Sequence, residues 1–288
     1  MRYTVPAPQA LLDALAALFP ESSRTTLRQM LQTGRVRVNG EVEKNARREL
    51  ETDDAVDVAE KAVHRNLPPE LSVLYEDADV IVVLKSHGLL TVATERERDT
   101  TAQAYLNAYL GQGKGKERIH VVHRLDRETS GVLVFAKNAY AREQLKEQFA
   151  AHTTERLYVA LVEGQMDPEH GTFRSYLREM KDLRMVSVDP HPDAKYAVTH
   201  YRTVETNGRY SMLEVQLETG RKNQIRAHLS EAGHPVLGDR MYGSEVNPIG
   251  RLGLHAKVLG FEHPVTRKKL VFTAPVPKGF RELFTRRE

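Results

Sequence analysis

The chain has no cysteine among its 288 residues. Disulfides and metal sites built on thiolates are therefore excluded, and this composition suits a reducing compartment such as the cytoplasm. No apolar run is long enough to cross a bilayer, and Asp13 and Pro20 interrupt the apolar stretch near the start, so we expect neither a membrane span nor a signal peptide. The net charge is only +3, so any case for nucleic-acid binding must come from local clusters of charge.

The length and the hydrophobic content of 40% predict two domains with at least one sizeable core. Residues 8–60 predict a small α+β module, in which two short amphipathic helices precede a hairpin marked by Asn39-Gly40. Residues 61–69 end in paired prolines and are expected to form a linker. Residues 70–288 mix strand-like and helical segments, which predicts a larger α+β domain with a mixed sheet. Its expected helices lie within 100–110, 138–154 and 222–233.

The small module concentrates basic side chains on two of its expected elements. Arg24 and Arg28 are four residues apart and share one face of a helix, while Arg35 and Arg37 are two apart and share one side of a strand. Together with Lys44 they predict a surface that binds RNA phosphates. The alternative is an ordinary solvated face.

The segment HRLDRETSG forms a polar elbow between two apolar strands. Asp126 lies between Arg124 and Arg127, and nearby positive charge favours the ionised carboxylate. A permanently charged aspartate suits a nucleophile or an electrostatic stabiliser. The alternative is a loop aspartate that is satisfied by the hydroxyls of Thr129 and Ser130.

A third basic cluster lies where the helix of residues 222–233 is expected to begin. Gly220 precedes the helix, so free backbone amides at the helix start face the loop. Arg221, Lys222 and Arg226 add positive charge, and Arg226 lies one turn past Lys222, where it could reach into a cleft. These side chains could equally be surface basics.

A metal site is not expected. His120 and His123 have a spacing that could hold a metal, but no further residue with suitable ligand spacing completes the set. The basic segment GQGKGK also fails as a phosphate-binding loop, because Glu117 follows where a hydroxyl is needed.

The segment SSRTTLRQMLQTGRVRVNGEVEKN resembles the ribosomal S-four-type RNA-binding domain, in which a short helix carrying Ser-Arg leads to Gly-x-Val-x-Val-Asn-Gly. The resemblance covers roughly residues 8–60. It implies binding to structured RNA.

The larger domain resembles the RluA family of pseudouridine synthases, which isomerise uridine to pseudouridine within RNA. HRLDRETSG matches the family signature in full, and KSHGLLTV, ERLYVALVEG, LETGRKNQIRAHL, GHPVLGDRMYG and LHAKVLGFEHP resemble further motifs in the family's order. The chain departs from the usual residues at Ser86, Arg156 and Asn223. The family fold is a mixed, mainly antiparallel sheet flanked by helices, with the active cleft across its middle.

The resemblance implies roles for individual residues. Asp126 takes the place of the catalytic nucleophile, Arg226 that of its salt-bridge partner, and Tyr158 that of a tyrosine that stacks on the target uracil and assists proton removal from carbon 5. Arg124 corresponds to the residue that enters the RNA stack when the uridine is flipped out. Whether the carboxylate attacks the base, attacks the sugar or removes a sugar proton stays open. The other expected substrate-binding residues are Leu89, Ile225, Arg221 and Lys222.

The isomerisation needs neither a cofactor nor a metal, and the expected partner is RNA. Large-subunit ribosomal RNA is the first expectation and transfer RNA an alternative, and we expect a monomer. A catalytically idle RNA-binding protein for ribosome assembly is a further alternative, but it should lack Asp126, Tyr158 or Arg226, and all are present. A glycosidase would need two carboxylates flanking one bond, which Asp126 and Glu128 do not suggest.

Overall fold

The computed structural model describes residues 2–32, 35–58, 67–111 and 118–285. The chain divides into two compact units, the first made of 1–67 with 106–117 and the second of 68–105 with 118–288. Most of the expected linker, residues 61–66, lies outside the described residues. No helix in the described ranges is both long and apolar enough to span a membrane.

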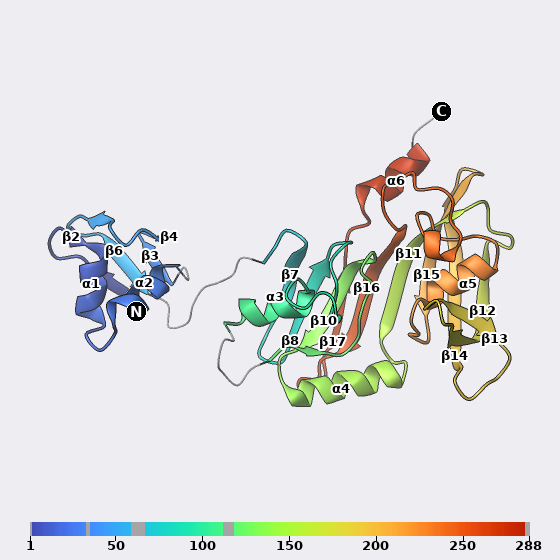
Figure 1. The fold of residues 1–288 in the computed structure, drawn as a ribbon, viewed down its shortest axis with the longest axis horizontal. Helices are drawn as coiled ribbons and strands as arrows, with labels where there is room; N and C mark the ends of the chain where they lie inside the picture. The colour runs from blue at the N-terminus through green and yellow to red at the C-terminus, as the bar shows by residue number, and fades with distance from the viewer. Residues whose placement is uncertain (1, 33–34, 59–66, 112–117, 286–288) are drawn as a thin grey trace. The chain divides into compact units, whose positions relative to one another are not determined.

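The first unit contains a sheet of four antiparallel strands in the order β1-β6-β3-β4, counted over its described residues (Figure 1). The module was expected to start at residue 8, but β1 precedes that point and pairs with β6. Leu11, Leu15, Leu27 and Leu31 of the two helices pack on the buried valines of the sheet to form one core. The elements are β1 (Arg2–Thr4), β2 (Gln9–Ala10), α1 (Leu11–Leu18), α2 (Arg24–Gln32), β3 (Val36–Val38), β4 (Glu41–Val42), β5 (Glu49–Leu50) and β6 (Ala55–Val58).

The predicted hairpin at Asn39-Gly40 is confirmed. Asn39 and Gly40 have φ angles of 53° and 87°, and β3 and β4 pair across them. Two consecutive residues with positive φ form the turn that suits the right-handed twist of a hairpin, and asparagine followed by glycine adopts it with the least strain. Asn39 also accepts a hydrogen bond from the Ala55 backbone (2.9 Å) and donates one to Asp54 (2.7 Å), which ties the hairpin to β6.

The second unit is built on a sheet of eleven strands within the described residues (Figure 1). The main path runs β13-β12-β14-β15-β11-β16-β10-β8-β7, with β17 on β16 and β9 on β10. The predicted α+β class with a mixed, mainly antiparallel sheet is confirmed. The strands are β7 (Leu71–Glu76), β8 (Val80–Lys85), β9 (His120–Val121), β10 (Ser130–Ala136), β11 (Glu155–Glu163), β12 (His170–Glu179), β13 (Met185–Val188), β14 (Lys195–Thr206), β15 (Tyr210–Leu217), β16 (Leu254–Glu262) and β17 (Lys269–Thr273).

Strands β10 and β16 run parallel at the start of β10, where Ser130 lies opposite His255 and Gly131 opposite Ala256. Gly131 has a φ angle of +128°, and a Cβ atom there would lie 2.1 Å from the Ala256 carbonyl oxygen. Only glycine allows this close approach. The signature elbow is therefore held against β16 at the point where it enters the sheet.

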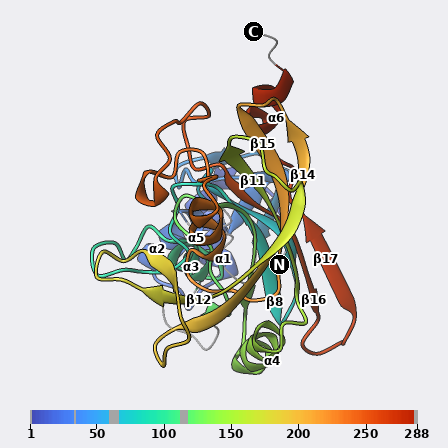
Figure 2. The same ribbon diagram turned by 90° about the vertical axis from the view of Figure 1, so that its right-hand side faces the viewer.

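Helices cover both faces of the sheet. Ala160 and Val162 of β11 pack with Ile225 of α5 on one face, whereas Val159 and Leu161 alternate to the other face and pack with α6. The long, curved strands β12 and β14 lie beside α5 (Figure 2). The helices are α3 (Ala102–Tyr109), α4 (Ala139–Ala150), α5 (Gln224–Glu231), the short helix η1 (Arg240–Tyr242) and α6 (Lys278–Thr285).

Candidate active site

A cavity of about 230 Å³ lies where the signature elbow, strand β11 and the start of α5 meet. Each element supplies the side chains that its local structure directs there. The elbow connects β9 to β10, and the side chain of Tyr158 shares the face of β11 that also carries Ala160 and Val162. The lining residues are Arg124, Leu125, Asp126, Thr129, Tyr158, Leu217, Gly220, Arg221, Lys222, Asn223, Gln224, Ile225, Arg226 and Leu254.

Asp126 and Arg226 form an ion pair in this cavity. Nη1 of Arg226 lies 3.4 Å from Oδ2 of Asp126, and the side chains are 13% and 29% exposed for Arg226 and Asp126. The two residues are 100 positions apart in the sequence, so only the fold brings them together. The arginine reaches the aspartate from the first turn of α5, as the sequence led us to expect.

Arg226 is itself held by Asp239, a residue to which the sequence analysis assigned no role. Nε and Nη2 of Arg226 donate to the two carboxylate oxygens of Asp239 at 2.6 and 2.7 Å, and the Asp239 side chain is 1% exposed. This bidentate ion pair fixes the plane of the guanidinium group. Burial opposes the charge of Arg226, but the hydrogen bonds and negative charge of Asp239, with Asp126 adding to them, raise its pKa above the ordinary value. The arginine therefore stays charged beside Asp126.

Two further contacts orient the same guanidinium group. Its Nη1 donates to Oδ1 of Asn223 at 3.1 Å, and its Cζ lies 4.8 Å from the centre of the Tyr242 ring. Asn223 has a φ angle of 49°, a left-handed conformation that asparagine tolerates better than most residues. The departure from the family pattern at Asn223 thus still gives Arg226 a polar contact.

Tyr158 lines the cavity with its ring. Burial raises the pKa of its hydroxyl to about 12, with Arg156 opposing the shift and Asp126 adding to it. The phenol is therefore protonated at neutral pH, and its aromatic face is the part suited to contact a planar ligand.

The remaining predicted residues fall into two groups. Arg124, Arg221, Lys222 and Ile225 line the cavity. Leu89 does not: it is 7% exposed, and its carbonyl oxygen accepts a hydrogen bond from Lys85. Its expected place in the apolar wall is taken by Leu125, Leu217 and Leu254.

Lys85, a second residue whose role we did not predict from the sequence, anchors the elbow. The Nζ atom of this fully buried lysine donates to the carbonyl oxygens of Ser86, Leu89 and Arg127 at 2.9, 2.7 and 3.1 Å. Burial lowers the pKa of Lys85 to about 7, and the charge of Asp126 opposes the shift. Three carbonyl acceptors match the three donors of an ammonium group, so this contact favours the charged form. A lysine that closes the apolar run VIVVLK was the signal for this role.

A second anchor joins the elbow to β16. The Ser130 hydroxyl lies 2.7 Å from Nδ1 of His255 and accepts a hydrogen bond from Nη2 of Arg251 at 2.8 Å. Ser130 is thus committed elsewhere, while the buried Thr129 hydroxyl has no partner in the described part of the chain. The arrangement does not support the alternative in which these two hydroxyls satisfy Asp126.

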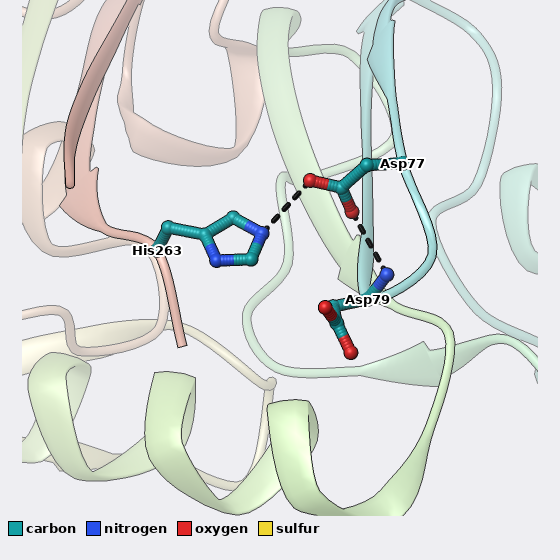
Figure 3. Close-up of side chains that lie close together, drawn as sticks. All are labelled: Asp77, Asp79 and His263. Atoms are coloured by element: carbon teal, nitrogen blue, oxygen red, sulfur yellow. Dashed lines mark hydrogen bonds and ion pairs between the residues drawn. The ribbon is translucent and has the colours of Figure 1, made fainter. Parts of the chain in front are cut away.

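Among the described residues, one group of three histidine and acidic side chains has its possible metal-ligand atoms close together, at Asp77, Asp79 and His263 (Figure 3). Nε2 of His263 lies 2.8 Å from Asp77, and Nδ1 accepts from the backbone amide of Thr266 at 3.0 Å. Asp77 also accepts from the hydroxyl of Tyr75 and from the amide of Asp79. Because these nitrogen and oxygen atoms already take part in hydrogen bonds, the cluster is a hydrogen-bonded turn rather than a candidate metal centre. His123 is likewise structural, since its Nε2 accepts from the Val134 amide and its ring stacks on Phe149.

In the first unit, the predicted basic side chains are solvent-accessible. Arg24, Arg28, Arg37 and Lys44 are exposed and Arg35 is half-buried. Arg24 pairs with Asp13, and Arg37 donates to the carbonyl oxygen of Gly40. The side chains of Arg28 and Lys44 form no ion pair with any described residue.

The cavity thus combines a carboxylate–arginine ion pair with an aromatic ring, groups that are suited to binding a planar polar ligand. Residues 79–231, more than half of the chain, match the family profile described as RNA pseudouridylate synthase. Residues 11–56 match the S4 domain. The chain belongs to the RNA pseudouridine synthases, isomerases that act on uridine within RNA, and carries an N-terminal S4 domain.

Individual relatives agree with this assignment. An uncharacterized RNA pseudouridine synthase of Bacillus subtilis, YlyB, is 36% identical over 278 residues, which covers 93% of this chain and 91% of the relative. The ribosomal large subunit pseudouridine synthase D of Vibrio cholerae is 32% identical over 295 residues, covering 96% and 90%. The solved structure of human RNA pseudouridylate synthase domain containing 4 is 26% identical and has a TM-score of 0.61 over 73% of this chain and 90% of the human chain.

Proposed function

We propose that the enzyme converts uridine to pseudouridine in large-subunit ribosomal RNA, with Asp126 as the nucleophile. The observation that carries the proposal is the contact of 3.4 Å between Asp126 and a doubly anchored Arg226 at the wall of the cavity. The ribosomal target is supported by the names of two relatives, the large subunit pseudouridine synthases D of Vibrio cholerae and Haemophilus ducreyi.

In this reaction the bond between N1 of uracil and C1′ of ribose breaks, the base turns, and a new bond joins C5 to C1′. C5 loses one proton and N1 gains one, so the atoms balance without an added reagent. The carboxylate of Asp126 attacks either the base or the sugar, and the bond that it forms breaks again before the product leaves. Arg226 orients that carboxylate through the ion pair, at the cost of removing both charges from water.

The neighbouring side chains complete the proposal. Tyr158 stacks on the uracil through its neutral ring, since a phenol with a pKa of about 12 is a poor source of phenolate at neutral pH. Arg124 fills the gap that the flipped uridine leaves in the RNA stack. Ile225 supplies apolar wall, and Arg221 and Lys222 contact phosphate.

The two units divide the work in this proposal. Residues 8–60 bind structured RNA through Arg24, Arg28, Arg35, Arg37 and Lys44, residues 61–69 link the units, and residues 70–288 carry the catalysis. The protein acts as a monomer, since one chain carries all of these groups.

Tritium release from RNA labelled at C5 of uridine tests the proposal. Ribosomal RNA and transfer RNA, both free of earlier modification, are incubated separately with wild type and with Asp126→Asn. We expect wild type alone to release tritium, and from large-subunit ribosomal RNA alone. Asp126→Asn should bind the same RNA with similar affinity, because the change removes one charge and little volume.

Each other outcome contradicts a distinct part. Release from transfer RNA alone would contradict the ribosomal target. Release by Asp126→Asn at the wild-type rate would contradict the nucleophile.

A further inference from the structure

A second cavity, of about 260 Å³, adjoins the first. Apart from the residues that it shares with the first cavity, its walls come from the loop of residues 90–94, from Leu183 in the turn between β12 and β13, and from Met241 in η1. Arg127 of the elbow lies at its edge. The two cavities share Arg124, Leu125, Asp126, Lys222, Asn223 and Arg226.

Leu183 is held in this wall at a cost to the protein. Its φ angle is +68°, and its side chain is 59% exposed. The turn is closed by hydrogen bonds from the Leu183 amide to the Met180 carbonyl (2.9 Å) and from the Met180 amide to the Arg184 carbonyl (2.8 Å). A leucine in the left-handed region is strained, and an exposed leucine recovers little by packing. The side chain of Leu183 therefore adds little to the stability of the folded chain.

Met241 gives the cavity a second apolar surface. It is 46% exposed, and its sulfur atom lies 3.9 Å from Nη2 of Arg226. Both apolar side chains thus lie in a cavity whose other wall is cationic. Arg127 and Lys222 are paired with Glu97 and Glu179, whereas Arg124 forms no ion pair with a described residue.

We propose that this second cavity receives the base of the nucleotide next to the target uridine on the same RNA strand. The inference rests on the proposed function, because it requires the uridine to occupy the first cavity. Since the two cavities share the wall around Asp126 and Arg226, the next nucleotide of a strand leaving the first cavity enters the second. Lys222, which lines both cavities, meets the phosphate that joins the two nucleotides.

The chemistry of the walls fits a nucleobase. Leu183 and Met241 offer apolar contact to a base face, and stacking of this kind tolerates any base. The backbone groups of Val92 and Ala93 make no hydrogen bond within the described structure, so they are available to the edge of a base. An unstacked neighbour also contributes binding free energy that offsets the unstacking of the uridine itself.

The test combines a change in the protein with a change in the RNA. A short hairpin is made around a uridine that wild type modifies in ribosomal RNA, and the nucleotide on either side is replaced in turn by an abasic one. We expect one abasic replacement to lower kcat/KM of wild type about tenfold, as loss of one stacked base does. Leu183→Ser should cost a similar factor on the intact hairpin and less than about twofold on that abasic hairpin, because the lost contact is the same.

Leu74→Ser, which changes another exposed leucine (41% exposed), is the matched control and should leave both substrates unaffected. If neither abasic replacement affects wild type, or if the two losses multiply, the second cavity does not hold that base, and the proposed function stands. If wild type releases no tritium from any RNA, the proposed function itself is wrong and this inference fails with it.

Discussion

Arg226 binds Asp239 through two nitrogens at 2.6 and 2.7 Å and reaches Asp126 with its third nitrogen at 3.4 Å. The closer carboxylate is therefore the one without a proposed chemical role. Asp239 holds the arginine in place, which leaves the carboxylate of Asp126, the proposed nucleophile, less tightly bound.

The first prediction concerns this positioning. Asp239→Asn keeps the size of the side chain, but the amide NH₂ group cannot accept a hydrogen bond from the guanidinium nitrogen that it faces. We expect kcat to fall about 100-fold, the scale associated with a small misplacement of a reacting group. The free energy of unfolding should also fall by about 3 kcal/mol, because a buried arginine loses its main counter-charge.

Single-turnover tritium release and urea denaturation measure the two effects. Glu143→Gln is the control, since Glu143 pairs with Arg142 at the surface of α4 and such a pair contributes little. An unchanged kcat in Asp239→Asn would remove Asp239 from the catalytic arrangement.

The second prediction concerns Thr129, a residue of the wall of the first cavity whose hydroxyl is buried without a partner in the described structure. If the substrate supplies that partner, Thr129→Val should lower kcat/KM about tenfold, the value of one hydrogen bond. Stability should not fall, because the hydroxyl is unsatisfied in the free protein. Thr154→Val makes the same change at another buried, unpartnered hydroxyl that does not line the cavity, and it should leave kcat/KM unaltered. Equal effects of the two substitutions would contradict the role of Thr129.

The third prediction is acid sensitivity. Burial lowers the pKa of His228 and of His255 to about 4, from an ordinary value of 6.5. Between pH 6.5 and 4 these histidines are protonated in the unfolded chain but not in the folded one. The free energy of unfolding therefore decreases as the pH falls through that window. Each histidine should lower the free energy of unfolding by about 2 kcal/mol at pH 5 relative to pH 8.

Urea denaturation at the two pH values measures the loss. His255→Asn removes one of the two groups and should make the pH dependence shallower by about half of their combined share. A His255→Asn variant with the full wild-type dependence would show that His255 titrates normally.

The fourth prediction concerns the first unit. Arg28→Gln combined with Arg37→Gln should weaken RNA binding and reduce the slope of log affinity against log salt by about 2, one for each lost phosphate contact. Filter binding at several salt concentrations measures both. Arg209→Gln with Arg267→Gln removes the same charge from exposed positions of the second unit. If both double variants behave alike, the effect comes from net charge rather than from a phosphate-binding surface.

The features that the sequence predicts are those with local causes. The Asn39-Gly40 hairpin follows from the φ angles of two residues, and the helix at α4 from its periodicity and the cap at Asn138. Strands β12 and β14 are hard to recognise in the sequence, because their side chains do not alternate regularly between buried and exposed. Some of their polar residues instead form hydrogen bonds with side chains of α5, as Thr199 does with His228.

The candidate site divides in the same way. Asp126, Tyr158 and Arg226 stand in motifs that can be matched by residue type, and a family resemblance carries their roles. Lys85 and Asp239 lie in the motifs KSHGLLTV and GHPVLGDRMYG, but their importance depends on their burial and on the carbonyl and guanidinium groups that they contact. Burial and contacts cannot be read from one sequence, since both arise when distant segments pack.

Strand β11 carries Tyr158 and is covered by α5 on one face and by α6 on the other. We expect amide protons in such a strand to exchange with solvent only when much of the domain opens, whereas those of a surface turn such as that around Leu183 need only a local opening. The strand at the centre of the site is thus rigid, and conformational change is easiest at the turn around Leu183. When enzyme and RNA meet, it is the RNA that must change shape.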